Sequence, residues 1–139
     1  MAILFDTSVI VSLLIEKDKN HERAKSLIQS IKKGNLGNWY FTDFILDEIL
    51  TVIWSRHKNK SIVQIAFQRM TEIESPFHLL YTSKITLNDI WEKWNKFAEY
   101  PKRPLSFTDA SLLAIAEEYS LQYIASFDGE FEGLISLLN

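Results

Sequence analysis

The sequence predicts an α/β protein: a three-layer α/β/α sandwich around a central, mainly parallel sheet of four to five strands. Short apolar or aromatic runs alternate along the chain with longer segments whose apolar residues recur at helical spacing. Such alternation is typical of a parallel sheet that is covered by helices on both faces. The chain of 139 residues also shows no repeat and no linker, so we expect one domain over residues 1–139.

Four short runs have the composition of strands. Residues 2–5 are continuously apolar, as in a strand buried on both faces, and residues 39–41 are aromatic. Residues 77–81 and 123–126 complete the expected set, whereas the apolar tail at 134–138 is ambiguous. In a parallel sheet, ligands bind beyond the carboxyl ends of the strands, so the residues that follow these runs are candidates for a site.

Between these runs, each expected helix has a polar residue near its start that can accept a backbone hydrogen bond. In chain order, the expected caps are the stretch 6–8, Asn20, Thr42 or Asp43, Ser61, Thr86 and a position near Asp109. The second helix is expected to end just before Gly34. The expected apolar stripes are Ile62, Ile65, Ala66 and Ile73 in the fourth helix, and Leu87, Ile90, Trp91, Trp94, Phe97 and Ala98 in the fifth.

The composition excludes several classes of protein. A hydrophobic fraction of 47% is that of a globular chain, and the absence of cysteine excludes disulfides and thiolate metal sites. The first residues lack the basic start of a secretory signal, and no apolar run approaches the ~20 residues that span a bilayer, so we expect a cytoplasmic protein without membrane contact. A net charge of −3 argues mildly against a general nucleic-acid binder, but an acidic metal site would itself supply several negative charges.

Two acidic residues follow expected strands. Asp6 ends the first strand, and Asp128 comes two residues after the last strand residue, Ser126. Because the carboxyl ends of parallel strands meet at one edge of a sheet, we expect the two carboxylates to lie close together. Each also has a local explanation: Asp6 can cap the following helix, and Asp128 with Gly129 forms a common turn dipeptide.

Two further acids lie on apolar helices. Glu48 borders a buried stripe, whereas the adjacent Asp47 lies on a more polar face. A salt bridge to a distant cation is the alternative for Glu48. Asp109 has capping-box spacing from Ser106, yet the helix beyond it is apolar on most sides. Such a helix belongs in the interior, so we expect Asp109 to point into a cleft.

These acids together predict a metal site. The residues expected to be both the metal ligands and the catalytic groups are Asp6, Glu48, Asp109 and Asp128. Two carboxylates 4 Å apart repel each other by about 4 kcal/mol at an effective dielectric constant near 20, so a cation is needed to hold such a cluster ionised. Ligand sets made only of oxygen favour Mg²⁺ or Mn²⁺, which bind phosphate and activate water. The hydroxyls expected to orient waters or ligands beside the ion are those of Thr7, Thr108 and Ser126.

The basic residues suggest where a substrate binds. Lys102 and Arg103 immediately precede the helix of Asp109, and we expect them to contact the substrate. The basic run at residues 56–60 is either a solvated turn between helices or a phosphate-binding segment. The three histidines are scattered and lack metal-ligand spacing.

Four segments of the chain resemble the PIN-domain nucleases, particularly the small VapC-type toxins of toxin–antitoxin pairs. The segments are ILFDTSVI at 3–10, FILDEIL at 44–50, LSFTDA at 105–110 and IASFD at 124–128. They carry the four acids in the family's order, whereas residues 60–104 match poorly. The resemblance implies a single PIN-like nuclease domain over residues 1–139 that hydrolyses phosphodiester bonds of RNA with metal-activated water. It also implies a homodimer and a small antitoxin protein that occupies the active cleft.

Three other functions fit parts of the pattern. A receiver-type signalling domain also groups acids around Mg²⁺, but it needs an Asp after the middle strand, where Thr82 and Ser83 stand, and a Lys after the last. A phosphatase of haloacid-dehalogenase type needs an Asp two residues after Asp6, where Ser8 stands. A catalytically latent RNA-binding or scaffold protein of the same fold is the third alternative, and a metal-titrated cleavage assay separates it from the enzyme.

Overall fold

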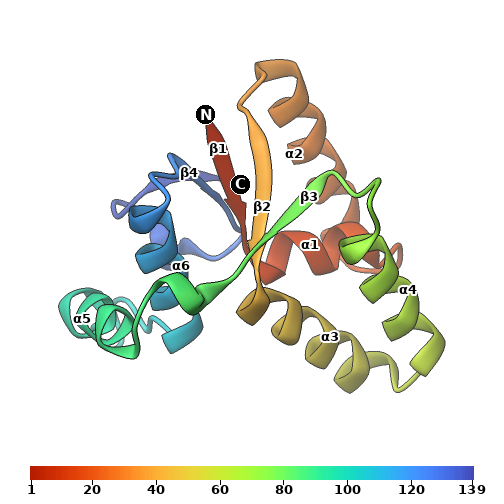
Figure 1. Ribbon diagram of the computed structural model, residues 1–139. Coiled ribbons are helices and arrows are strands. Elements are labelled where there is room, and N and C mark those ends of the chain that lie inside the picture. Colours follow the sequence, from red (N-terminus) through yellow and green to blue (C-terminus); the bar gives the residue numbers. More distant parts are fainter.

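The computed structural model describes every residue from 1 to 139 (Figure 1). The five strands are β1 (Ala2–Phe5), β2 (Asn38–Thr42), β3 (Phe77–Leu80), β4 (Tyr123–Ala125) and β5 (Ser136–Leu138). The six α-helices are α1 (Thr7–Leu14), α2 (His21–Gly34), α3 (Asp43–His57), α4 (Lys60–Thr71), α5 (Leu87–Phe97) and α6 (Phe107–Glu118). Two 3₁₀ turns, η1 (Thr82–Lys84) and η2 (Gly129–Phe131), complete the set.

All neighbouring strands of the sheet are parallel, in the order β3-β2-β1-β4-β5. In the central strand, Leu4 is level with Tyr40 of β2 and with Ile124 of β4. The chain moves outward from β1 to β3 and then returns to the other side of β1, so the strand order reverses between β1 and β4. In open α/β sheets this reversal leaves a crevice beyond the carboxyl ends of the strands, where ligands bind.

Helices cover both faces of the sheet, which confirms the predicted three-layer sandwich. Helices α1 to α4 lie on one side and α5 and α6 on the other (Figure 1). Right-handed crossovers explain this division. The connections from β1 to β2 and from β2 to β3 run in the same direction and place their helices on one face. The return from β3 to β4 runs the opposite way and places α5 and α6 on the other face.

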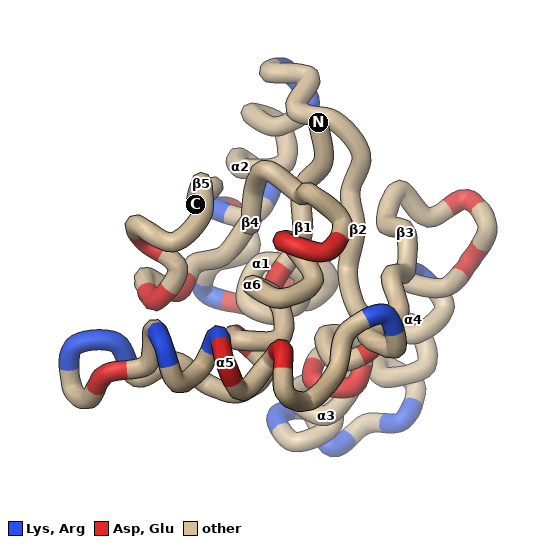
Figure 2. Tube along the Cα trace, turned by 60° about the vertical axis from the view of Figure 1, so that its left-hand side comes forward, with Lys and Arg blue, Asp and Glu red and all other residues tan.

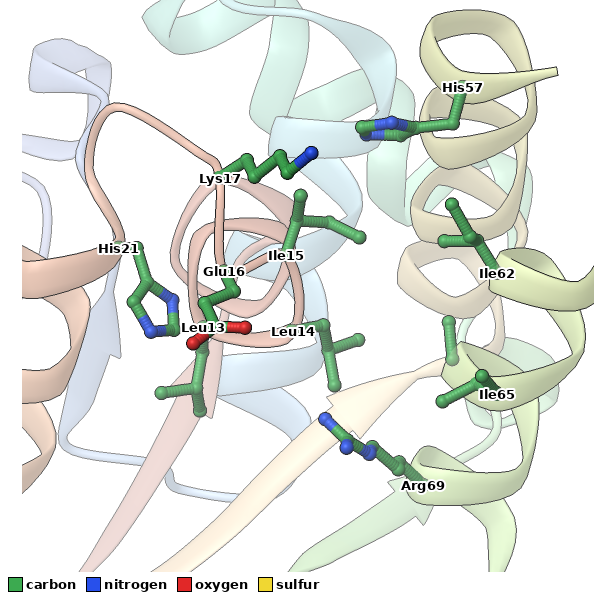
Figure 3. Close-up of a pocket in the computed structure, with 11 residues that line it drawn as sticks. Leu13, Leu14, Ile15, Glu16, Lys17, His21, His57, Ile62, Ile65 and Arg69 are labelled. Carbon is green, nitrogen blue, oxygen red and sulfur yellow. The ribbon is translucent and has the colours of Figure 1, made fainter. Parts of the chain in front are cut away.

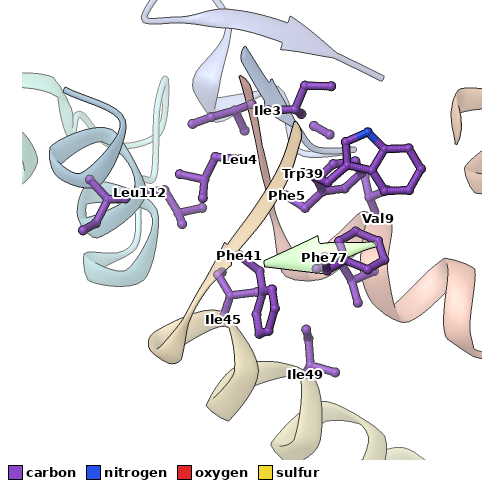
Figure 4. Packing of buried hydrophobic residues seen from close by; sticks show 14 of the residues in the cluster. Ile3, Leu4, Phe5, Val9, Trp39, Phe41, Ile45, Ile49, Phe77 and Leu112 are labelled. Atoms are coloured by element: carbon purple, nitrogen blue, oxygen red, sulfur yellow. The ribbon is translucent and has the colours of Figure 1, made fainter. Parts of the chain in front are cut away.

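The core is a continuous cluster of 28 buried residues between the layers. Residues 3–5 of β1 are fully buried because β1 is central and covered on both faces. Aromatic rings from three adjacent strands pack together: Phe5 lies 5.5 Å from Trp39 and 5.1 Å from Phe77 between ring centroids (Figure 4). This packing holds β1, β2 and β3 together on the face that carries helices α1 and α3.

The structure confirms some expected helix ends and corrects others. Thr42 caps α3 by accepting the Ile45 N–H, and Thr86 forms a reciprocal capping box at the start of α5. The cap expected at Ser61 is wrong, because the Asn59 side chain accepts the Ser61 N–H and α4 begins earlier.

The second helix also differs from the expectation. Asn20 occupies the position before α2 but its side chain makes no capping bond. Gly34 is the last helical residue, and Asn35 adopts the left-handed conformation that ends the helix, with φ of 48°.

Two expected apolar stripes are only partly buried. In α5, Ile90 is buried whereas Leu87 and Trp91 are exposed. Helix α5 packs against α6 rather than on the sheet, so only one side of its stripe is covered. Ile65 on α4 is also exposed, and Ile73 lies beyond the end of that helix. The ambiguous tail contains β5, which pairs with β4.

None of the helices is both long and apolar enough to cross a membrane. Acidic and basic positions are spread over the molecule, and basic positions gather at the turn between α3 and α4 (Figure 2). This turn carries Arg56, Lys58 and Lys60.

Candidate functional site

The loops after β1 and β4 meet where the strand order reverses. The backbone N–H of Asp6 donates to the Ala125 carbonyl at 3.0 Å. The Asp6 carboxylate accepts hydrogen bonds from the Thr7 N–H at 2.8 Å, from the Ser126 hydroxyl at 2.7 Å and from the Ser8 hydroxyl at 3.0 Å. Since Ser126 follows Asp6 by 120 positions, this one carboxylate joins the two loops.

The two serine hydroxyls also hold the backbone of the loop after β4. Ser8 Oγ accepts the Phe127 N–H at 3.0 Å, and Ser126 Oγ accepts the Asp128 N–H at 3.0 Å. Each hydroxyl has one proton, and both protons go to the same oxygen, Asp6 Oδ2. The 3.4 Å between the two Oγ atoms is therefore a contact between two donors. Through Ser126, Asp6 fixes the backbone position of Asp128.

Asp6 lies in an environment that disfavours its charge. Its side chain is buried, with the residue 2% exposed, and this burial raises the pKa of Asp6 to about 7. The hydrogen bonds from Ser126 and Ser8 lower this pKa, whereas the charges of Asp109 and Asp128 raise it. Burial outweighs the hydrogen bonds, and none of the three ion pairs in the structure supplies Asp6 with a counter-charge.

Asp109 serves as a helix cap at the edge of the same region. Its carboxylate accepts the Ser106 N–H at 3.0 Å, and its own N–H donates to the Ser106 hydroxyl at 3.0 Å. The capping box that begins α6 is thus reciprocal, as the spacing predicts. Partial burial raises the pKa of Asp109, the bonds with Ser106 lower it, and the nearby charge of Glu130 raises it.

Asp128 and Glu48 border a cavity of about 280 Å³ together with Asp6. Partial burial and the charges of Glu130, Asp109 and Glu48 raise the pKa of Asp128. The structure places Glu48, and not the exposed Asp47, on the cavity. Asp109 does not line this cavity, but its charge acts on both Asp6 and Asp128, so the four expected acids lie in one neighbourhood.

Their carboxylates are not gathered around a single point, contrary to the simplest form of the expectation. No group of three or more acidic or histidine side chains is placed to hold a metal ion. The physical reason is local: the Ser106 N–H holds the Asp109 carboxylate against the start of α6, and three donors hold that of Asp6. Only Oδ2 of Asp109 accepts the Ser106 N–H, so its other oxygen, Oδ1, is available to a ligand.

The chemistry of the donors nevertheless fits a hard divalent cation. All the available ligand atoms are oxygens, which Mg²⁺ and Mn²⁺ prefer. None of the four expected acids is paired with Lys or Arg. Moreover, one carboxylate oxygen of Glu130, Oε2, is buried without any hydrogen-bond partner, and a buried acceptor in that condition is costly. A cation in this region would offset the burial of Asp6 and the mutual repulsion of the acids.

The remaining expected residues are placed in different ways. Thr7 lines the cavity and its hydroxyl is buried without a partner, whereas the Thr108 side chain makes no hydrogen bond. Lys102 is exposed in the loop before α6, and the Arg103 guanidinium donates to the Glu132 carbonyl at 2.9 Å. Neither Lys102 nor Arg103 lines the cavity, so substrate contact there stays a prediction.

Sequence reasoning missed three residues of the site, Ser8, Lys19 and Glu130, and named Arg56 only as part of a basic run. Ser8 holds Asp6 and the loop after β4, and Glu130 is a fifth acid that acts on Asp109 and Asp128. Its place two residues after Asp128 was the available signal. Lys19 and Arg56 line the same cavity as Asp6, Glu48 and Asp128, and no local pattern in the sequence brings these two cations together.

A second, larger cavity of about 630 Å³ lies apart from the acids, between the end of α1 and helix α4. Figure 3 shows Leu14 and Ile15 facing Ile62 and Ile65 across it, with His57 and Arg69 at opposite ends. Its lining mixes apolar and basic side chains, which suits contact with another protein better than hydrolysis of a phosphodiester bond.

Comparison with known proteins agrees with this geometry. The profile of the PIN domain family matches residues 3–134. A VapC ribonuclease of Archaeoglobus fulgidus is 28% identical over 131 residues, which cover 94% of this chain and 80% of that protein.

Two solved structures share the fold. VapC20 of Mycobacterium tuberculosis, described as a sarcin–ricin loop cleaving toxin, superposes with a TM-score of 0.72 at 21% identity, and the match covers 95% of this chain and 94% of that one. FitAcB of Neisseria gonorrhoeae contains a chain that superposes with a TM-score of 0.69 at 20% identity, over 99% and 96% of the two chains. Since the family profile spans almost the whole sequence and the acids lie where the strand order reverses, this chain belongs to the PIN domain family.

Proposed function

We propose that this protein is an endoribonuclease that hydrolyses phosphodiester bonds of RNA with the help of Mg²⁺ or Mn²⁺. The observation that carries the proposal is a group of acids at the reversal point of the sheet, none of which is paired with a cation. Its members are Asp6, Glu48, Asp109, Asp128 and Glu130. The relatives support the choice of substrate, since one is named a ribonuclease and another cleaves the sarcin–ricin loop.

The residues of the chain have separate roles in this proposal. Asp6, Glu48, Asp109 and Asp128 would hold the cation. When bound, the cation supplies an activated water nucleophile and stabilises the charge that develops on the attacked phosphate. Ser126 and Ser8 keep the Asp6 carboxylate oriented, because both donate to its Oδ2 atom. The Glu130 carboxylate adds negative charge beside Asp109 and Asp128.

We also propose that the protein acts in the cytoplasm as the toxin of a toxin–antitoxin pair, as a homodimer that a small antitoxin protein inhibits. The names of the relatives, VapC and FitAcB, support this role. The receiver-type and haloacid-dehalogenase-type alternatives do not survive the match to the PIN domain family. A catalytically latent protein of the same fold is the second candidate, because the acids are not preassembled around one point.

A cleavage assay with a matched pair of variants tests the proposal. Single-stranded RNA is incubated with the protein in Mg²⁺, in Mn²⁺ and in EDTA, and the products are resolved by length. We expect Asp6→Asn to lower the rate at least about a hundredfold, since it removes a ligand from an ion that supplies several kcal/mol. Asp47→Asn makes the same chemical change at an exposed position and should leave the rate unchanged.

Two results would contradict the enzyme assignment. Cleavage that persists in EDTA, or that Asp6→Asn leaves intact, would show that the metal site is not where the reaction occurs. Binding of RNA without cleavage in either metal would favour the latent protein.

A further inference from the structure

We infer that Arg56 and Lys19 form a phosphate-binding subsite for the RNA strand next to the bond that is cut. The inference deepens the proposed function, on which it rests for the identity of the ligand. Both residues line the cavity of about 280 Å³ that also contains Asp6, Glu48 and Asp128. The lining of one cavity therefore carries both acidic and basic side chains.

Helix α3 sets the spacing between Glu48 and Arg56. Glu48, Val52 and Arg56 recur every four residues along α3, and all three line the cavity. Eight residues of α-helix separate Glu48 from Arg56, which is about 12 Å along the helix axis. Arg56 is thus offset from Glu48 along the helix, which suits it to bind a phosphate that flanks the bond being cut.

The loop between α1 and α2 positions the guanidinium. Asp18 Oδ2 lies 3.5 Å from Arg56 Nη1, while Asp18 Oδ1 accepts the Ser12 hydroxyl at 3.1 Å and the Asn20 N–H at 2.8 Å. Asp18 is therefore fixed by two neutral donors, and it restrains one nitrogen of Arg56. The Arg56 side chain is 59% exposed, so its other N–H donors are open to a ligand.

Lys19 provides the remaining positive charge. It lies beside Asp18 in the same loop, it is exposed, and it takes part in none of the three ion pairs. Lys19 and Arg56 with the single carboxylate of Asp18 leave one net positive charge in this part of the lining. A phosphate oxygen between Lys19 and Arg56 would meet a point charge on one side and a planar donor on the other.

The test measures RNA binding rather than cleavage, so that it does not depend on the chemistry. In an Asp6→Asn background, the affinity for a short fluorescein-labelled single-stranded RNA is measured by anisotropy over a range of salt concentrations. Loss of one phosphate contact should lower the slope of log affinity against log salt by about 0.7, and Arg56→Ala should weaken binding about tenfold at low salt. Arg56→Lys should keep the slope and lose only part of the affinity.

Lys33→Ala is the matched control. It removes one positive charge from an exposed position in the last turn of α2, which leads into the opposite end of the sheet. Its slope should equal that of the parent, and circular dichroism should show the same thermal midpoint for the parent and for Arg56→Ala.

Two outcomes would overturn the subsite. If Arg56→Ala and Lys33→Ala have the same slope as the parent, Arg56 contacts no phosphate, and a contact with a protein partner becomes the better explanation. If the parent binds no RNA, the subsite is also wrong, whatever the cleavage assay shows. Failure of cleavage alone, with the expected change in slope, would sink the catalytic proposal and leave the subsite standing.

Discussion

The buried carboxyl of Asp6 makes the stability of this protein depend on pH and on divalent metal. Burial raises its pKa from 3.8 to about 7 in the folded protein. Between these two values the native state keeps a proton that the unfolded chain gives up, so the free energy of unfolding falls as the pH rises. A difference of about 3 in pKa, at 1.36 kcal/mol for each pH unit, corresponds to a loss of about 4 kcal/mol between pH 4 and pH 8. For a chain of this size, that is on the order of 10 °C in the midpoint of thermal unfolding.

The assay is thermal unfolding in EDTA at several pH values between 4 and 8, for the parent protein and for Asp6→Asn. The variant removes the most strongly shifted group, so its midpoint should change less than that of the parent over this range, with Asp109 and Asp128 leaving a smaller dependence. Asp47→Asn alters an exposed carboxylate of α3 and should behave like the parent. Adding Mg²⁺ or Mn²⁺ should raise the midpoint of the parent more at pH 8 than at pH 5, because an ion binds the ionised carboxylate. Equal pH dependence in the parent and in Asp6→Asn would refute the argument that burial governs this group.

Three further predictions concern the supports of the site and of the fold. Ser126→Ala removes a hydrogen bond to the buried Asp6 carboxylate and should lower the free energy of unfolding by about 1–3 kcal/mol. Because this bond lowers the pKa of Asp6, its loss should also move the rising limb of the pH–rate profile for cleavage to higher pH. An unchanged profile would contradict a role of Ser126 in holding Asp6. Asp43→Asn weakens the bonds from the Thr82 N–H and hydroxyl that tie η1 to α3, and urea unfolding should report a loss of about 1 kcal/mol; no change in the midpoint would show that η1 does not depend on this contact. Gly37→Ala should prevent normal folding, because a Cβ atom there would lie 1.8 Å from the Met1 carbonyl oxygen and the residue has φ of 100°. A variant that unfolds at the same midpoint as the parent would contradict this close approach.

The sequence by itself determined the features that depend on neighbouring residues or on burial of whole elements. The apolar run that forms β1 marks a central strand because such a strand is covered on both faces. The capping boxes at Thr86 and Ser106 were predictable, since both partners of each hydrogen bond lie within four residues. Where two local patterns compete, as at Asn59 and Ser61, the order along the chain does not decide which one caps the helix.

Only the tertiary structure decided which distant residues meet, and how. The strand order β3-β2-β1-β4-β5 brings Ser126 to Asp6 across 120 positions, and the packing of α1 against α3 brings Asp18 to Arg56. The packing of α5 against α6 left Trp91 exposed, because an apolar stripe shows what a helix can bury and not how much of it another element covers. The sequence was enough to name the four candidate acids. Their burial, their separation and the cations that face them depend on contacts between elements, which no local pattern records.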